Sequence, residues 1–366
     1  MRLDRLVSVF LVVLSLHAPK PAVSQSPTPM EPTGRQPVSD FRAVVTADRV
    51  QAISLDVQAA DKSGAPVPNL HAGDFTVLDN KQPQSIASVQ AIDITSAENE
   101  APVEIILAID AINVGKETVI EEFDWLHKYL DKSGKQLALP TSFAFLQDPN
   151  VTMQNHPTRD TAALSRFLDS NRTGFRALRT SSGGWGDIER EQISLNELNS
   201  IAAQSERRAG RKLLLWIGPG WGEGPDPNAR PIGKTQLKLF NEIIAESDEL
   251  RKARITLEMI DPTISGGRIF NFNYEPFVKG ISDARNAEYG HLMLPTLAAQ
   301  SGGQVLYGST DLPALIDRCV ADANSYYLVT YDLPHASHAN EYHTIEIKID
   351  RPDVVARTRA GYYGQP

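Results

Sequence analysis

The feature that most constrains the fold is an apolar run, Val103 to Ile109, which is interrupted only by Glu104 and ends in Asp110. An apolar run without alternation is typical of a strand buried on both faces of a parallel sheet. Apolar residues then recur at three- and four-residue spacings from Val119 to Leu130, as on one face of a helix. Because parallel strands need a crossover connection, this segment indicates a strand-helix unit of an α/β sheet.

Strand and helix signals continue to alternate after this unit. The expected strands are Ser142–Leu146, Val151–Gln154, Lys212–Ile217, Ile255–Ile260 and Gln304–Tyr307. The expected helices are Asp160–Leu168, Ile188–Arg208, Lys234–Lys252, Leu292–Gln300 and Leu312–Asn324, with Thr158 or Asp160 as the N-cap of the first. The alternation predicts an α/β domain over residues 101–324, with a mostly parallel sheet and helices on both faces.

In the segments on both sides of this domain, apolar and polar residues instead alternate with a period of two. Ile53, Leu55 and Val57 alternate with polar residues near the start, and alternation returns from Tyr326 to the end of the chain. Neither flank alone has enough strands to bury two sheet faces. We therefore expect residues 41–97 and 325–366 to build one small antiparallel β-sandwich, into which the α/β domain is inserted.

The first 24 residues have the pattern of a secretory signal peptide. Arg2 and Arg5 precede the apolar stretch Leu6–Leu16, and Ala22-Val23-Ser24 supplies small residues for cleavage. The apolar stretch is too short to span a bilayer as a helix. Residues 25–40 are rich in proline and are expected to form a flexible leader.

The negative net charge of the chain argues against some classes of binding partner. The formal net charge is −9, and cleavage of the signal peptide, which removes three basic residues and one acidic residue, would leave −11. Such a charge argues against nucleic acid and anionic lipid as partners. We therefore expect an exported protein, periplasmic or extracellular, with no membrane insertion after signal cleavage. The single cysteine, Cys319, lies among apolar helical positions and is expected to be a buried small residue.

Segments in both flanks carry a resemblance to a known family. They are Val57–Val67 with Asn69–Lys81 in the first flank, and Ser325–Tyr331, Arg351-Pro352 and the closing Arg359–Tyr363 in the second. With the buried strand that ends in Asp110, they resemble the VWFA-related family of secreted bacterial proteins, described mainly from acidobacteria. The resemblance covers residues 45–363. It implies a von Willebrand A-type (Rossmann-like) domain within the expected β-sandwich.

Many domains of this type carry a metal-ion-dependent adhesion site that begins with Asp-x-Ser-x-Ser after the first strand. Hydroxyl and carboxylate oxygens suit a hard cation such as Mg²⁺ or Mn²⁺. Here Asp110 matches the pattern, but Ile112 and Val114 stand at the serine positions. The family's Gly-Gly-Thr falls near Gly183-Gly184-Trp185, and Gly218-Pro219-Gly220 offers no carboxylate after the strand that should precede one.

The residues left to gather a divalent ion are Asp110, Asn113 and Asp187. Two carboxylates make a poor cage for such an ion, so we expect a degenerate site and no cofactor. The alternative that we favour is that Asp110 hydrogen-bonds its own loop or caps the next helix.

The loops after the strands form the ligand face of open α/β sheets. They are expected at Asp110–Val114, Ser181–Asp187, Gly218–Gly224 and Asp261–Phe277. Their aromatic residues include Trp185, Trp221, Phe270, Phe272 and Tyr274. One hypothesis is that these aromatic side chains, with Asp110, Asn113 and Asp187, contact an unknown protein partner. The alternative is that they pack beneath their own loops.

No nucleophile elbow, P-loop, His-Glu-x-x-His or Gly-x-Gly-x-x-Gly motif is present in the sequence. The sequence therefore favours an exported, non-enzymatic protein-binding or adhesion-type module. Three alternatives stay open: a metal-dependent adhesion protein that uses Asp110 with non-standard ligands, a structural component of an envelope assembly, and an enzyme whose site has no familiar pattern.

Overall fold

The computed structural model describes residues 52–93, 103–147, 150–172, 184–221, 226, 228–263, 272–334 and 336–366, except the side chains of Gly184 and Trp185. All described residues belong to one compact unit, which is assigned to Asp48–Pro366. The expected signal peptide and leader lie outside the described residues. None of the helices within the described ranges is long and apolar enough to cross a membrane.

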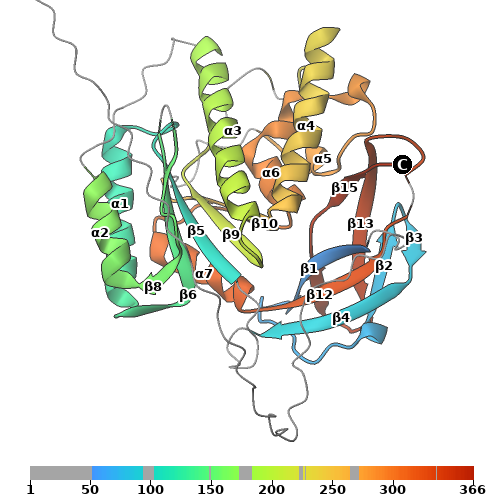
Figure 1. Ribbon diagram of the computed structural model, residues 1–366, viewed down its shortest axis with the longest axis horizontal. Helices are drawn as coiled ribbons and strands as arrows, with labels where there is room; N and C mark the ends of the chain where they lie inside the picture. Colours follow the sequence, from blue (N-terminus) through green and yellow to red (C-terminus); the bar gives the residue numbers. More distant parts are fainter. Residues whose placement is uncertain are drawn as a thin grey trace, which may run out of the picture. The chain divides into compact units, whose positions relative to one another are not determined.

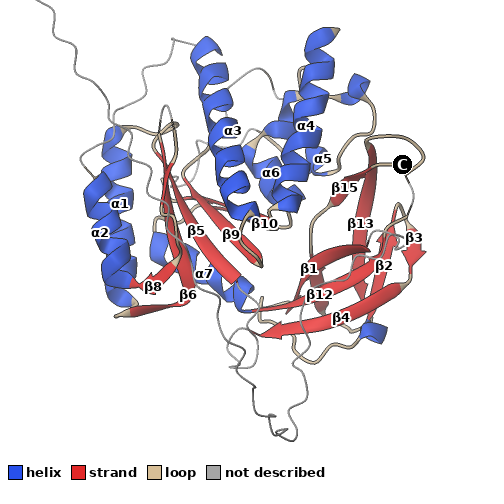
Figure 2. Cartoon of the chain, viewed as in Figure 1, coloured by secondary structure: helices blue, strands red, loops and turns tan. Residues whose placement is uncertain are grey.

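A seven-stranded sheet forms the centre of the compact unit (Figures 1 and 2). Its strands are β5 (Val103–Asp110), β6 (Gln136–Leu146), β7 (Thr152–Met153), β8 (Thr158–Asp160), β9 (Arg211–Ile217), β10 (Ile255–Asp261) and β11 (Val305–Tyr307). The order is β11-β10-β9-β5-β6-β7, and β8 also pairs with β6. Pairing is parallel from β11 to β6, whereas β7 and β8 run antiparallel to β6. The path has the 3-2-1-4-5-6 order of doubly wound sheets.

Helices cover both faces of this sheet. They are α1 (Lys116–Lys132), α2 (Thr161–Asn171), α3 (Gly184–Glu206), α4 (Lys234–Lys252), α5 (Glu275–Val278), α6 (Leu294–Gln300) and α7 (Leu312–Asn324), with the 3-10 turns η2 (Ala284–Asn286) and η3 (Tyr289–Leu292). Residues of α1, α2 and α7 share one core with one face of the sheet, and residues of α3, α4 and α6 share a second core with the other face.

Strand β5 shows why the sheet has two covered faces. Its residues Ile105, Leu107 and Ile109 belong to the core under α1 and α7, whereas Ile106 and Ala108 belong to the core under α3 and α4. Because successive side chains of a strand point to opposite faces, a strand apolar at nearly every position must be covered twice. Burial of every residue of β5 follows from this arrangement.

The two ends of the chain pair with each other in two antiparallel sheets. One has the order β14-β1-β12-β4 and the other β15-β13-β2-β3. The strands are β1 (Ala52–Asp61), β2 (Phe75–Asp79), β3 (Gln82–Gln84), β4 (Ile86–Asp93), β12 (Ser325–Asp332), β13 (Glu341–Ile349), β14 (Val354–Arg357) and β15 (Gly361–Gly364), with η1 (Ala72–Asp74) before β2. Both sheets contribute to one apolar core, which makes this part a β-sandwich.

The predicted architecture is confirmed: a mostly parallel α/β sheet with helices on both faces is inserted between two halves of an antiparallel sandwich. Asp160 is the N-cap of α2, and its side chain accepts from the amides of Ala162 and Ala163. The expected helix 292–300 begins only at Leu294, after the 3-10 turn η3, and Pro295 lies in its first turn. Sequence reasoning missed the short helices between residues 275 and 292 because they are too brief to show a helical period.

Candidate functional site

The candidate site lies where β5 and β9 end, at the edge of the central sheet that we call the carboxyl edge. In the parallel register of these strands Ile109 stands opposite Ile217, so Asp110 and Gly218 follow side by side. Gly218 has a φ of 131°, and a Cβ atom on it would lie 2.7 Å from Cβ of Asp110. Only glycine therefore fits at position 218, and its absent side chain leaves the room that Asp110 occupies.

Asp110 is fully buried and is held by nitrogen donors. Its Oδ1 accepts from the backbone amides of Ile112 and Asn113, each at 3.0 Å. Its Oδ2 accepts from the indole Nε1 of Trp216 at 3.0 Å. The side-chain amide of Asn113 reaches both oxygens, at 3.1 Å and 2.9 Å. Burial raises the pKa of Asp110, while the hydrogen bonds from Asn113 and Trp216 oppose that rise.

Helix α3 completes this arrangement from the other side of the loop. Nδ2 of Asn113 also donates to Oγ of Ser194 at 3.0 Å. Trp216 packs edge-on against Trp221, with ring centroids 5.4 Å apart. We call Asp110, Asn113, Ser194 and Trp216 the Asp110 cluster. It joins the end of β5, the end of β9 and helix α3 into one hydrogen-bonded unit.

Asp110 was expected either to hydrogen-bond its own loop or to cap the next helix. In the structure its carboxylate accepts hydrogen bonds from its own loop. The N-cap of α1 is Gly115, so Asp110 does not cap that helix. Sequence reasoning missed Trp216 and Ser194. Trp216 lies inside an apolar run that does not reveal which side chain meets a carboxylate, and Ser194 lies far from Asp110 in the sequence.

Two further acids lie near the Asp110 cluster. Asp261 ends β10, and its Oδ1 accepts from the amide and hydroxyl of Thr263 at 2.9 Å and 2.6 Å. Glu122 on α1 is completely buried, and within the described ranges neither of its carboxylate oxygens has a hydrogen-bond partner. Burial, with Asp110 and Asp261 nearby, raises the pKa of Glu122 well above its ordinary range. A carboxyl in such a place is favoured in its neutral form, which is a poor ligand for a cation.

The residues proposed as metal ligands are only partly brought together. Asp110 and Asn113 are in contact, but Asn113 presents its amide nitrogen to Asp110. Asp187 forms an ion pair with Arg190 within α3. Over the part of the chain that the structure describes, no group of three His, Cys, Asp or Glu side chains could hold a metal ion. A cation at Asp110 would first have to displace the nitrogen donors from both carboxylate oxygens.

The aromatic residues of the loops are largely packed inward. Trp221 is only 4% exposed and donates its indole Nε1 to the carbonyl of Leu292 at 3.0 Å. The rings of Phe272 and Phe277 are in contact, with centroids 5.4 Å apart, and Phe272 and Tyr274 are half-buried. Trp221 is therefore a core residue, as the self-packing alternative expects. Phe270 and the side chain of Trp185 lie outside the described residues.

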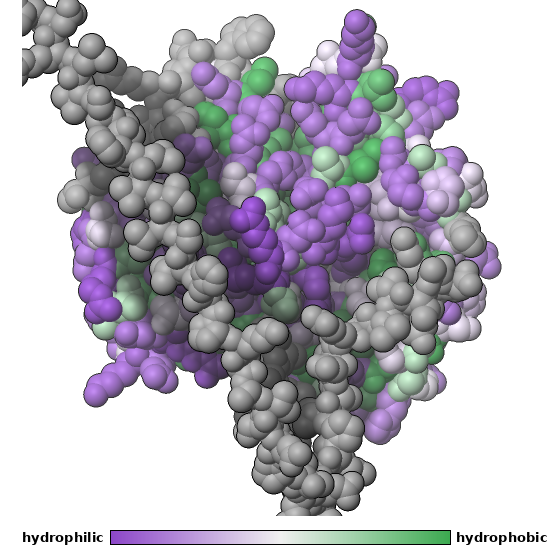
Figure 3. Space-filling model, in the orientation of Figure 1, coloured by the Kyte–Doolittle hydropathy of each residue, from purple (hydrophilic) through white to green (hydrophobic). Residues whose placement is uncertain are grey.

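The exposed apolar residues at this edge are different ones. Within the described ranges, the exposed large hydrophobic residues are Ile188, Ile232, Leu237, Tyr307 and Val355. Ile188 lies in the second turn of α3, Ile232 and Leu237 flank the start of α4, and Tyr307 ends β11. All four lie where strands end or where helices begin at the carboxyl edge. In Figure 3, apolar surface appears among polar groups along the upper side, where α3 and α4 lie in Figure 1.

Sequence comparison gives no relative: the chain matches no protein-family model, and no curated protein is similar to it at a significant level. Solved structures are similar at low identity. The proximal thread matrix protein 1 of the mussel byssus is 13% identical, with a TM-score of 0.35 over 67% of this chain and 51% of that protein. This chain therefore spans about half the length of that protein.

Two other solved structures illustrate the range of these matches. The manganese-loaded TRAP protein of Plasmodium vivax is 10% identical, with a TM-score of 0.32 over 77% of this chain and 100% of that one. The pilus adhesin SpaC of Lactobacillus rhamnosus GG is 10% identical, with a TM-score of 0.36 over 83% of this chain and 42% of that one.

Proposed function

We propose that the chain is an exported, non-enzymatic, adhesion-type module that binds a protein partner at the carboxyl edge without a metal ion. The observation that carries the proposal is the placement of exposed apolar side chains. Four of the five exposed large hydrophobic residues within the described ranges lie at this edge, and Val355 is the exception. Open α/β sheets bind their ligands outside the carboxyl ends of their strands.

The degree of exposure supports a surface that a partner covers. Ile232 is 86% exposed, Tyr307 56% and Ile188 42%. Burying a large apolar side chain of this kind contributes roughly 1.5–3 kcal/mol, whereas leaving it in water contributes nothing. Tyr274, which is half-buried near Tyr307, adds an amphipathic ring of the type that interfaces favour.

The geometry of the Asp110 cluster supports binding without a cation. In a cation-dependent site the carboxylate of Asp110 would have to turn free lone pairs toward the metal. Here its oxygens accept from two backbone amides, the Asn113 amide and the Trp216 indole. In this proposal the cluster supports the loop as a rigid element, and the contacts to the partner come from Ile188, Ile232 and Tyr307 around it.

Site-specific photo-crosslinking tests this function. A photoreactive amino acid is placed at Ile232 or Tyr307, and a matched control is placed at Val355 on β14, which is about as exposed as Tyr307. The modified chains are exposed to the exported proteins of the source organism, with and without EDTA. We expect one adduct from positions 232 and 307 that EDTA does not diminish, and none from position 355.

Three results would contradict the proposal. Adducts of equal yield at all three positions would mean that the carboxyl edge is no special surface. An adduct that EDTA abolishes would instead favour metal-dependent adhesion through Asp110. Stable co-purification with one envelope protein in the absence of any crosslink at the edge would favour a structural role in an envelope assembly.

A further inference from the structure

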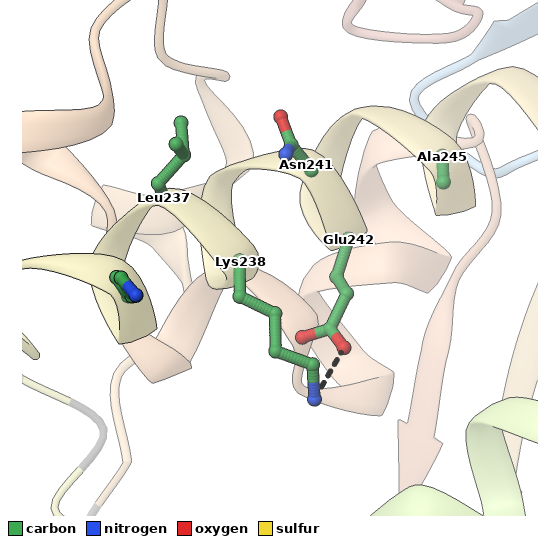
Figure 4. Close-up of a pocket in the computed structure, with 6 residues that line it drawn as sticks. Leu237, Lys238, Asn241, Glu242 and Ala245 are labelled. Atoms are coloured by element: carbon green, nitrogen blue, oxygen red, sulfur yellow. Dashed lines mark ion pairs between the residues drawn. The ribbon is translucent and has the colours of Figure 1, made fainter.

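The outward face of α4 carries a shallow groove. The groove has a volume of about 500 Å³ and is lined by Lys234, Leu237, Lys238, Asn241, Glu242 and Ala245. These residues form two rows at four-residue spacing, one of Leu237, Asn241 and Ala245 and one of Lys234, Lys238 and Glu242. Figure 4 shows the first row along one side of the helix, with Lys238 and Glu242 along the other. We call these six residues the outer face of α4.

From this face we infer that two copies of the chain associate through α4, with the two helices crossing antiparallel about a two-fold axis near Asn241. Rows at four-residue spacing are the ridges that interdigitate in the commonest packing of helices, at about −50°. The ridge Leu237-Asn241-Ala245 of each copy would enter the groove between the two rows of the other. A two-fold interface needs a surface that is complementary to itself, and two features of α4 meet this requirement.

The first feature is the size of the side chains. Leu237 and Ala245 stand four residues on either side of Asn241. An antiparallel copy therefore sets the large, 54% exposed Leu237 of one helix against the small Ala245 of the other. Asn241 meets its own copy at the axis, where two side-chain amides, each with donors and an acceptor, can pair.

The second feature is the order of the charges. The first part of the face carries Lys234 and Lys238, and Glu242 follows them. Lys238 and Glu242 also pair within the helix at 3.1 Å. An antiparallel copy brings the lysines of each helix toward Glu242 of the other, so the charges are complementary across the axis, whereas a parallel copy would set like charges together.

Sedimentation velocity of the purified full chain over a wide concentration range tests the association. We expect a monomer–dimer equilibrium that both Leu237→Glu and Asn241→Glu weaken by about tenfold or more, since the first buries a carboxylate against Ala245 and the second sets two carboxylates together at the axis. Thr235→Glu is the matched control, because Thr235 is exposed on the same helix but does not line the groove. Lys238→Glu alone should weaken the dimer, and Lys238→Glu with Glu242→Lys should restore it.

A less disruptive variant tests the same association if the charged variants fail to fold. Asn241→Cys introduces a thiol at the axis, and the native Cys319 is buried and does not compete. Mild oxidation should give a disulfide-linked dimer from Asn241→Cys and none from Thr235→Cys. A chain that stays monomeric at every concentration, or a dimer that the substitutions at positions 237 and 241 leave unchanged, would overturn the inference.

Discussion

At the scale of single residues, the Asp110 cluster depends on a charge-assisted hydrogen bond and on one glycine. The indole of Trp216 donates to the buried carboxyl of Asp110 at 3.0 Å, and the indole of Trp221 donates to a backbone carbonyl at the same distance. Hydrogen bonds to charged groups contribute about 1.5–3 kcal/mol, and those between neutral groups about 0.5–1.5 kcal/mol. The two tryptophans therefore form a matched pair for mutation.

We expect Trp216→Phe to lower the free energy of unfolding by about 1 kcal/mol more than Trp221→Phe does. Both substitutions remove a similar volume from one core cluster, so the difference reports the hydrogen bond to Asp110. Urea unfolding of the two variants measures it. Equal losses would mean that the indole of Trp216 contributes no more to Asp110 than an ordinary hydrogen bond.

Gly218 gives a second prediction at this scale. A Cβ atom at Gly218 would meet Cβ of Asp110 at 2.7 Å, whereas one at Gly308, which also has a positive φ, would meet nothing within 4 Å. Gly308→Ala should therefore cost only its backbone strain, about 1–2 kcal/mol, and Gly218→Ala should cost clearly more. Thermal unfolding of both variants measures this difference. Similar melting temperatures for Gly218→Ala and Gly308→Ala would show that Asp110 at the end of β5 can shift to accommodate a Cβ atom at little cost.

At the scale of the elements, buried glutamates connect the stability of α4 and β10 with pH. Burial raises the pKa of Glu246 on α4, and of Glu258 on β10, to about 7 from an ordinary value of 4.5. A carboxyl whose pKa is raised on folding stabilises the fold fully below its unfolded pKa, and this contribution is lost as the pH rises through the folded value. Stability should therefore fall between about pH 4.5 and pH 7.

Glu246→Gln tests this pH dependence. The variant keeps an amide that can still meet Asn199, which donates to Glu246 at 2.7 Å, and it removes the titration. The wild-type chain should lose up to about 3 kcal/mol more than the variant between pH 5 and pH 8. The exposed Glu117, exchanged for Gln, is the control. Parallel pH profiles for all three chains would rule out Glu246 as a source of the pH dependence.

The sequence predicted the helices and strands better than it predicted the directions and contacts of individual side chains. The period of apolar residues predicted β5, β9 and α4 because each must bury a face of fixed periodicity. Loops have no such period, so the pattern could not say that Trp221 turns inward while Ile232 turns to solvent. Similarly, the contact between Asp110 and Trp216 arises from the pairing register of β5 with β9, which a single sequence does not contain.

At the scale of the whole molecule, the two ends of the chain are tied together inside the sandwich. Asp79 of β2 accepts from the hydroxyls of Tyr331 and Tyr362 at 3.1 Å and 2.6 Å, and its Oδ1 lies 2.7 Å from Nδ1 of His343. All four side chains are buried, and they come from both halves of the sandwich. A polar network, as well as an apolar core, therefore joins the N-terminal and C-terminal halves of the sandwich.

We expect Asp79→Ala to destabilise the sandwich by about 3–5 kcal/mol, because it leaves buried polar partners without their acceptor. Hydrogen exchange should show faster exchange in β1–β4 and in β12–β15 together, since neither half retains a core without the other. The exposed Asp353→Ala is the control. Loss of protection confined to the C-terminal strands would contradict closure of the sandwich by both ends.

Asp110 is held by nitrogen donors, and we propose that the module acts without a cation. Thermal unfolding of the chain in EDTA, Mg²⁺, Mn²⁺ and Ca²⁺, alongside Asp110→Ala, tests it most directly. An ion at a hundred times its dissociation constant would add about 2.7 kcal/mol to the stability. We predict one melting temperature in all four conditions for the wild-type chain and a lower, equally ion-independent one for the variant. A stabilisation by Mg²⁺ or Mn²⁺ that disappears in Asp110→Ala would contradict the proposal that the module acts without a cation.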